Sequence, residues 1–146
     1  MSEAGEDADA AAAAPANPVR GEVSVPLGEA GREFVLRPDY TAIQAIEEGT
    51  GKGMMRLFRD CAEGNMTLAE TATVVAECVK AQGRATGDKL MALYAAEKLV
   101  PMIVDSPIGL VGVQGRVSTV LGFAICGDYN SAGELKAAAG RAKATG

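Results

Sequence analysis

The residue types that carry most enzymatic chemistry are sparse in this sequence of 146 residues. It has no histidine, which removes the commonest general base and metal ligand along with any Ser-His-Asp or Cys-His nucleophile. Its cysteines, Cys61, Cys78 and Cys126, form no Cys-x-x-Cys pair and cannot complete a four-ligand zinc site without histidine. Cys61 and Cys78 occupy apolar positions of expected helices, where a free cysteine packs as a small hydrophobe. We expect no metal and no cofactor.

Two short motifs resemble functional sites but lack essential residues. The sequence EGTGKG, residues 48–53, resembles a phosphate-binding loop, but Ile46 stands in place of its first glycine and Gly53 replaces the Ser or Thr that would hold magnesium. A connection between two helices explains it better. An Asp-Ser pair at 105–106 resembles the phosphopantetheine site of acyl carrier proteins. Pro107 follows it, so Ser106 is better explained as a helix N-cap with proline at N1.

Adjacent carboxylates also fail to predict catalysis. Glu47 and Glu48 lie at an expected helix end, where their side chains point about 100° apart and cannot work as a general acid and base pair. A solvated helix face is the ordinary explanation. The sequence therefore predicts a protein that is not an enzyme.

The charge distribution excludes another class of function. The net charge is −5, and four acidic residues fall within the first nine positions: Glu3, Glu6, Asp7 and Asp9. The remainder is nearly neutral and lacks the clustered Lys and Arg that bind a phosphate backbone, so we expect no nucleic-acid partner. The odd number of cysteines and the lack of a signal-peptide pattern favour a reducing cytoplasm.

The first secondary-structure element that the sequence predicts is a β-hairpin. Apolar side chains alternate along two runs, at Val19, Val23, Val25 and Leu27 and then at Phe34 and Leu36. Gly28 and Gly31 bracket the link and can supply the positive φ angles that reverse a chain. Both edges of such a hairpin are open to pairing with a second copy, which would give a symmetric homodimer.

Helices follow the hairpin. Asp39 caps a first helix that buries Ala42, Ile43 and Ile46 and is expected to end at Gly49. A second helix begins with the apolar stripe at Met54 and closes at Gly64.

The third helix opens with a capping box formed by Thr67 and Glu70 and is expected to end at Gly83. It is apolar on two faces, so we expect it at the centre of the core. Asp88 caps a fourth helix that continues to Val100, and Pro101 breaks the chain after it.

Residues 108–126 are nearly long enough to cross a bilayer and carry one charge, Arg116. Arg116 would cost about 2.5–3.5 kcal/mol at mid-membrane, and four glycines dilute the hydrophobicity. A glycine-rich segment that leads into a short core-facing helix explains this pattern better than a membrane span, so we expect no membrane association. The segment Ser131–Glu134 could cap one more turn.

Together these elements predict a mainly helical α+β fold, in which an N-terminal β-hairpin packs on a bundle of about five short helices. Residues 1–16 are Ala-rich and acidic and are expected to form a disordered leader. Residues 17–127 are expected to form a single domain, and residues 128–146 a short capped turn with a flexible basic tail.

The hairpin and first helix carry a resemblance. The order NPVRGEV, then GREFVLRP, then a short helix closing on Glu47 and Gly51, resembles the small tail assembly chaperone family of gene transfer agents and long-tailed phages. The resemblance is clearest over residues 17 to about 80 and loose from there to Gly127. It implies a non-enzymatic protein that binds the tape-measure protein, and tail tube subunits, in the cytoplasm of a host bacterium and is absent from the mature particle.

A helix-binding surface would serve that role, and flexible methionines suit it. The candidates are Met54, Met55, Met91 and Met102, for each of which core packing is the competing explanation. The alternative function is a structural tail tube or adaptor subunit that is retained in the particle. One hairpin supplies few of the strands from which such tubes are built.

Overall fold

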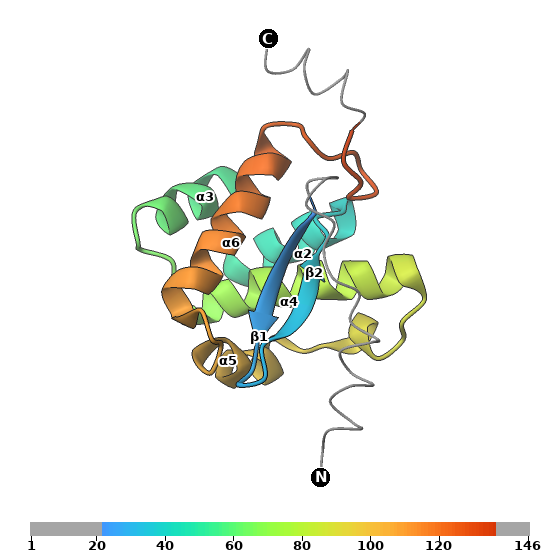
Figure 1. The fold of residues 1–146 in the computed structure, drawn as a ribbon. Helices are drawn as coiled ribbons and strands as arrows, with labels where there is room; N and C mark the ends of the chain where they lie inside the picture. The colour runs from blue at the N-terminus through green and yellow to red at the C-terminus, as the bar shows by residue number, and fades with distance from the viewer. Residues whose placement is uncertain (1–21, 137–146) are drawn as a thin grey trace.

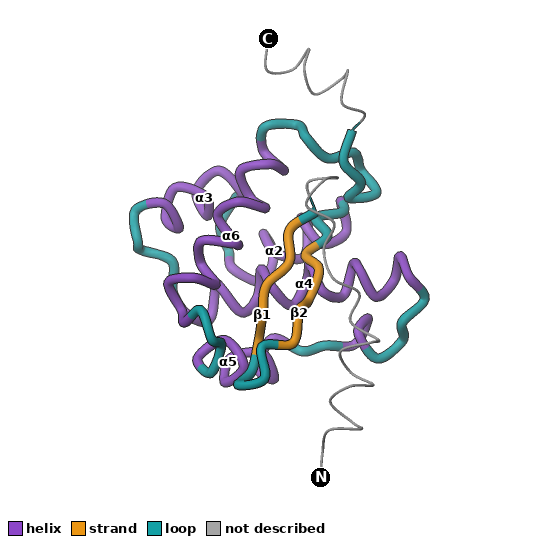
Figure 2. Tube along the Cα trace, in the orientation of Figure 1, coloured by secondary structure: helices purple, strands orange, loops and turns teal. Residues whose placement is uncertain are grey.

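The computed structural model describes residues 22–136 (Figures 1 and 2). The expected leader, the start of the first strand at Val19 and the end of the basic tail lie outside the described residues. In chain order the elements are β1 (Val23–Leu27), β2 (Arg32–Leu36), α2 (Tyr40–Thr50), α3 (Met54–Ala62), α4 (Leu68–Thr86), the 3-10 turn η2 (Met91–Leu93), α5 (Ala96–Val104) and α6 (Gly109–Ile125). The predicted fold class is confirmed: a two-stranded antiparallel hairpin packs against five helices.

The hairpin forms as the alternating pattern predicts. Val25 lies opposite Phe34 in the register, and both side chains are fully buried. Gly28 and Gly31 adopt φ angles of 73° and 69°, so the link uses glycine at both positions where an L side chain would be strained. One face of the sheet therefore forms part of the core.

Helix α4 lies at the centre of the core, as predicted. Figure 1 shows it crossing behind the hairpin, with α6 and α5 to one side and below. Its capping box is present: the Glu70 amide donates to the Thr67 hydroxyl, and the Thr67 amide donates to the Glu70 carboxylate. Its buried positions cover two faces: Thr71, Ala72, Val74, Val75, Ala76, Cys78, Val79, Ala81 and Gly83.

Two predicted helix ends are wrong. Helix α2 runs to Thr50 and is capped by Gly51 in the left-handed region, past the expected stop at Gly49. Helix α4 continues through Gly83 to Thr86 and is capped by Gly87. Gly83 is glycine for another reason, since a Cβ there would lie 2.8 Å from the Cβ of Met91. The glycine allows η2 to pack closely on the helix.

The expected fourth helix is divided in two. Asp88 caps its start, accepting a hydrogen bond from the Met91 amide at 3.0 Å. The turn η2 then ends at Tyr94, which is extended, and its ring meets Phe34 edge-on with ring centroids 5.5 Å apart. This aromatic contact on the hairpin separates η2 from α5. Pro101 lies inside α5, on its exposed side, rather than after it.

The glycine-rich segment is one continuous helix, α6, rather than an approach followed by a short helix. Its core-facing stripe is Val113, Val117, Val120 and Leu121. Gly122 leaves room for the Phe58 ring of α3, because a Cβ there would lie 3.1 Å from the Phe58 Cε1 atom. None of the helices in residues 22–136 is both long and apolar enough to span a membrane.

The turn expected at Ser131–Glu134 is not helical. Residues 128–136 fold back on themselves through an isolated bridge between Tyr129 and Leu135. The Tyr40 amide donates to the Ser131 carbonyl at 2.9 Å, and the Arg37 Nε donates to the Ala132 carbonyl at 2.9 Å. This C-terminal turn (residues 128–136) is therefore attached to the end of β2 and the start of α2.

Candidate interaction surfaces

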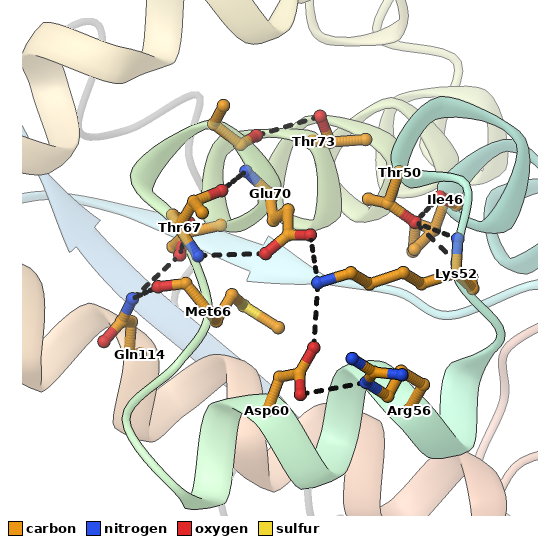
Figure 3. A network of polar contacts seen from close by, with 12 residues as sticks. Ile46, Thr50, Lys52, Arg56, Asp60, Met66, Thr67, Glu70, Thr73 and Gln114 are labelled. Atoms are coloured by element: carbon orange, nitrogen blue, oxygen red, sulfur yellow. Dashed lines mark hydrogen bonds and ion pairs between the residues drawn. The ribbon is translucent and has the colours of Figure 1, made fainter.

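A network of charged side chains joins α3 to the start of α4 (Figure 3). The Lys52 side chain, from the α2–α3 connection, extends between two carboxylates. Its Nζ atom lies 2.9 Å from Asp60 Oδ2 and 2.8 Å from Glu70 Oε2. Arg56 adds a second cation, with its Nε 3.1 Å from Asp60 Oδ1. These four residues form the Lys52 network.

Each charge in the Lys52 network stabilises its neighbour. Hydrogen bonds to Glu70 and Asp60 raise the pKa of Lys52 above its ordinary value. The Lys52 ammonium in turn lowers the pKa of Asp60 and of Glu70, and the Thr67 amide assists at Glu70. Carboxylates held ionised in this way are poorly suited to exchange protons with a substrate at neutral pH. The arrangement fits a structural role, linking α3 to α4.

The residues of the rejected motifs, Lys52, Glu47 and Ser106, each make contacts that hold elements of the fold together. Lys52 lies in the predicted helix-to-helix connection and is paired as described. Glu47, the first of the adjacent glutamates, accepts a hydrogen bond from the Met54 amide at 3.0 Å and so caps the start of α3. Ser106 does not occupy the N-cap position of α6, which is Ile108. Its buried hydroxyl donates to the Pro26 carbonyl of β1 and accepts from the Ile108 amide.

The three cysteines differ in how deeply they are buried. Cys78 is buried in α4, and burial raises the pKa of its thiol. Cys61 is half-buried, its pKa is also raised by burial, and its Sγ lies 3.2 Å from the Gln114 carbonyl oxygen. Cys126 is exposed. Within residues 22–136, no three His, Cys, Asp or Glu side chains are grouped so that they could hold a metal ion.

The four candidate methionines do not share a surface. Met54 and Met91 are buried in the core, at 8 % and 5 % exposure. Met102 is partly buried and packs against the same core. Met55 alone among the four is well exposed, at 64 %. A binding surface built from these methionines would therefore need the core to open.

Several other large apolar side chains are exposed. Leu90 and Leu93 lie around η2, at 82 % and 77 % exposure, and three more lie close together in sequence where α5 leads into α6. Val104, at the end of α5, is 58 % exposed, and Leu110 and Val111, in the first turn of α6, are 37 % and 85 % exposed. We call these three residues the α5–α6 corner. The sequence analysis missed it because α6 was expected to begin later. The available signal was Val111, which falls two positions before Val113 and thus on the far side of the helix from the core stripe.

The outer edge of β1 is covered by other parts of the fold. Along β1, the Ser24 carbonyl accepts from Arg116 Nη1 at 2.6 Å, the Pro26 carbonyl accepts from Ser106 Oγ, and the Gly28 amide donates to the Met102 carbonyl at 2.8 Å. Helices α5 and α6 and their connection therefore occupy this edge, so it is closed to pairing with a second copy.

A pocket of about 240 Å³ lies beside β2. The strand, the C-terminal half of α4 and the C-terminal turn enclose it. Its lining residues are Glu22, Val35, Leu36, Arg37, Gln82, Tyr129, Gly133, Glu134 and Leu135. The pocket is thus built from segments far apart in the sequence, which no local motif could reveal.

Comparisons with protein-family models, with curated proteins and with solved structures find no match to this chain.

Proposed function

We propose that this protein is a non-enzymatic tail assembly chaperone that binds a tape-measure protein in the bacterial cytoplasm while a phage or gene-transfer-agent tail is built. Tail tube subunits are a second partner under the same proposal. It rests on the sequence resemblance over residues 17 to about 80. The structural observation that supports it is the exposed apolar surface of the α5–α6 corner.

Exposed apolar groups of this kind favour a protein partner. Val104 and Val111 are both more than half exposed, as are Tyr40, Met55, Leu90 and Leu93 elsewhere on the described residues. Covering apolar surface yields roughly 25 cal/mol for each Å² removed from water. A tape-measure protein is long, helical and apolar on one face, and that face needs cover until the tube encloses it. The α5–α6 corner could supply that cover.

The polar groups support a binding role over catalysis. The charges of the Lys52 network are paired with one another, and Glu47 is engaged as a helix cap. Beside the exposed apolar corner, Asp105 and Ser106 are the residues of nucleophile or general-base type between Val104 and Leu110, and the Ser106 hydroxyl is buried and bonded to the Pro26 carbonyl. Chemistry of the enzymatic kind would need groups that are free to react, so an assembly role accounts better for what these side chains do.

The alternative is a tail tube or adaptor subunit that stays in the particle. It differs from the chaperone in persistence, because a structural subunit remains stoichiometric after assembly. A two-stranded sheet with one edge closed offers limited means to build a continuous tube wall.

One experiment separates the two functions. The chain is co-expressed with the tape-measure protein of the same gene cluster, the soluble fraction is analysed by size-exclusion chromatography with light scattering, and purified particles are blotted for the chain. A chaperone keeps the tape measure soluble in a defined complex and is missing from particles. Stoichiometric presence in particles with an insoluble tape measure supports the structural subunit instead.

A further inference from the structure

We infer that the guanidinium group of Arg32, at the start of β2, binds a carboxylate through its Nε and Nη2 atoms. The carboxylate belongs either to a small free molecule or to an acidic side chain of a partner protein. This site is separate from the α5–α6 corner. The inference goes beyond the chaperone proposal, because it concerns a charged group and not the exposed apolar surface.

Arg32 lies on the core-facing side of the hairpin. In the register it is opposite Leu27, which is 1 % exposed, and residues directly opposite each other share one face of a sheet. Phe34 follows two positions later on the same face and is fully buried. Arg32 itself is half-buried. A positive charge therefore stands in a row of core side chains, where a charged group normally has an ionic partner.

Two aromatic side chains fix the orientation of the guanidinium. Its Cζ atom lies 4.6 Å from the centroid of the Phe34 ring, and its Nη1 atom donates to the Tyr94 hydroxyl at 3.2 Å. The ring face attracts the cation but does not neutralise it. Because the planar group is already held in place, a ligand that binds it costs little further loss of side-chain freedom.

The described part of the chain supplies no carboxylate to Arg32. Three other arginines are each ion-paired with an acidic side chain: Arg37, Arg56 and Arg84. Arg32 forms no ion pair with any residue in the range 22–136. The neighbouring Glu33 points to the opposite face of the sheet, where it accepts a hydrogen bond from the Ser24 hydroxyl at 2.8 Å.

One edge of the guanidinium is free to bind. Nε is shielded from water and makes no hydrogen bond to the described residues, and Nη2 makes none either but is not enclosed. These two nitrogens lie along the same edge, and their parallel N–H bonds match the two oxygens of a carboxylate. A carboxylate that enters past Nη2 would satisfy both. The single charge of a carboxylate also suits one cation better than a phosphate, which carries about −1.5 to −2 at neutral pH.

The test follows the Nε–H signal of Arg32 by nuclear magnetic resonance while the full chain is titrated with sodium acetate at constant ionic strength. We expect a saturable shift. The Nε–H signal of Arg59, an exposed arginine of α3, is the internal control and should move by less than about a tenth as much. The second probe is the peptide acetyl-Gly-Glu-Gly-amide. A shift with acetate alone assigns the site to small free carboxylates, and a shift with both probes shows that a protein side chain also fits.

Two variants test the assigned atoms. Arg32→Lys keeps the charge but removes the planar fork, so acetate binding, followed through the Tyr94 amide signal, should weaken by at least about tenfold. Arg59→Lys is the matched control and should bind within about twofold of the unmodified chain. Tyr94→Phe removes the hydrogen-bond acceptor of Nη1, so the Arg32 signal should report binding weakened by about threefold or more.

The inference is overturned if neither probe gives a saturable shift, or if the Arg59 signal moves as far as that of Arg32. Unchanged acetate binding by Arg32→Lys would also overturn it. A stronger response to sodium phosphate than to acetate, at the same ionic strength, would contradict the class of ligand. None of these results bears on whether the tape measure is kept soluble, so the two proposals fail separately.

Discussion

At the residue scale, several polar side chains singled out in the sequence hold the fold together. Ser106 and Arg116 both bind carbonyls of β1, and Lys52 joins two helices. Residue types suggested that none was catalytic, but could not identify the partners. The partner of Ser106 lies 80 residues away in the sequence, and that of Arg116 lies 92 residues away. Such contacts depend on the completed fold.

The Lys52 network gives a pH-dependent prediction. The pKa values of Asp60 and Glu70 are lowered in the folded state from their ordinary 3.8 and 4.5. Their contribution to stability is therefore present above about pH 4.5 and is lost as the pH falls through the lowered pKa values. Lys52→Met should reduce the free energy of unfolding at pH 7, and the difference from the unmodified chain should shrink at pH 3.

Urea unfolding at the two pH values measures this difference. Lys89→Met is the control, because Lys89 is an exposed lysine in the loop before η2. It should have little effect at either pH. An equal effect of Lys52→Met at pH 7 and pH 3 would contradict the assigned ion pairs.

At the element scale, local signals predicted how elements begin better than how they end. The hairpin, the capping box of α4 and the start of α3 follow from nearby residues, and all were predicted correctly. The helix ends predicted from glycine were wrong at Gly83, which lies within α4, and over the first turns of α6. A glycine can stop a helix or allow another segment to approach it closely. Only the position of the neighbouring segment distinguishes the two roles.

Two glycine substitutions test that distinction. Gly83→Ala is expected to lower the free energy of unfolding by about 1–3 kcal/mol, because its Cβ would lie 2.8 Å from Met91 Cβ. Gly115→Ala, in α6, has no atom within 4 Å of its Cβ and should raise stability by up to about 1 kcal/mol. Chemical denaturation of both variants measures the two effects. Stabilisation by Gly83→Ala would show that α4 and η2 are not packed as described.

At the scale of the whole molecule, the pattern of apolar residues, caps and turn glycines predicted the fold class but not the exposed surface. The methionines were chosen by type, and the structure buries two of the four. The α5–α6 corner was missed because its exposure depends on where α5 ends and α6 begins. The pocket beside β2 is lined by segments that are far apart in the sequence. Surfaces assembled in this way are properties of the tertiary structure.

The α5–α6 corner provides the most direct test of the proposed function. Val111 is 85 % exposed, so Val111→Glu should leave the fold intact while placing a charge on the apolar surface. Thr119→Glu adds the same charge at an exposed position further along α6 and serves as the matched control. Circular dichroism establishes that both variants are folded.

The measurement is the mass of the complex with the tape-measure protein, by light scattering after co-expression. We expect the unmodified chain and Thr119→Glu to form the same soluble complex, and Val111→Glu to lose it and leave the tape measure insoluble. A complex of unchanged mass with Val111→Glu would contradict binding through the α5–α6 corner, and failure of the unmodified chain to form any complex would contradict the chaperone function itself.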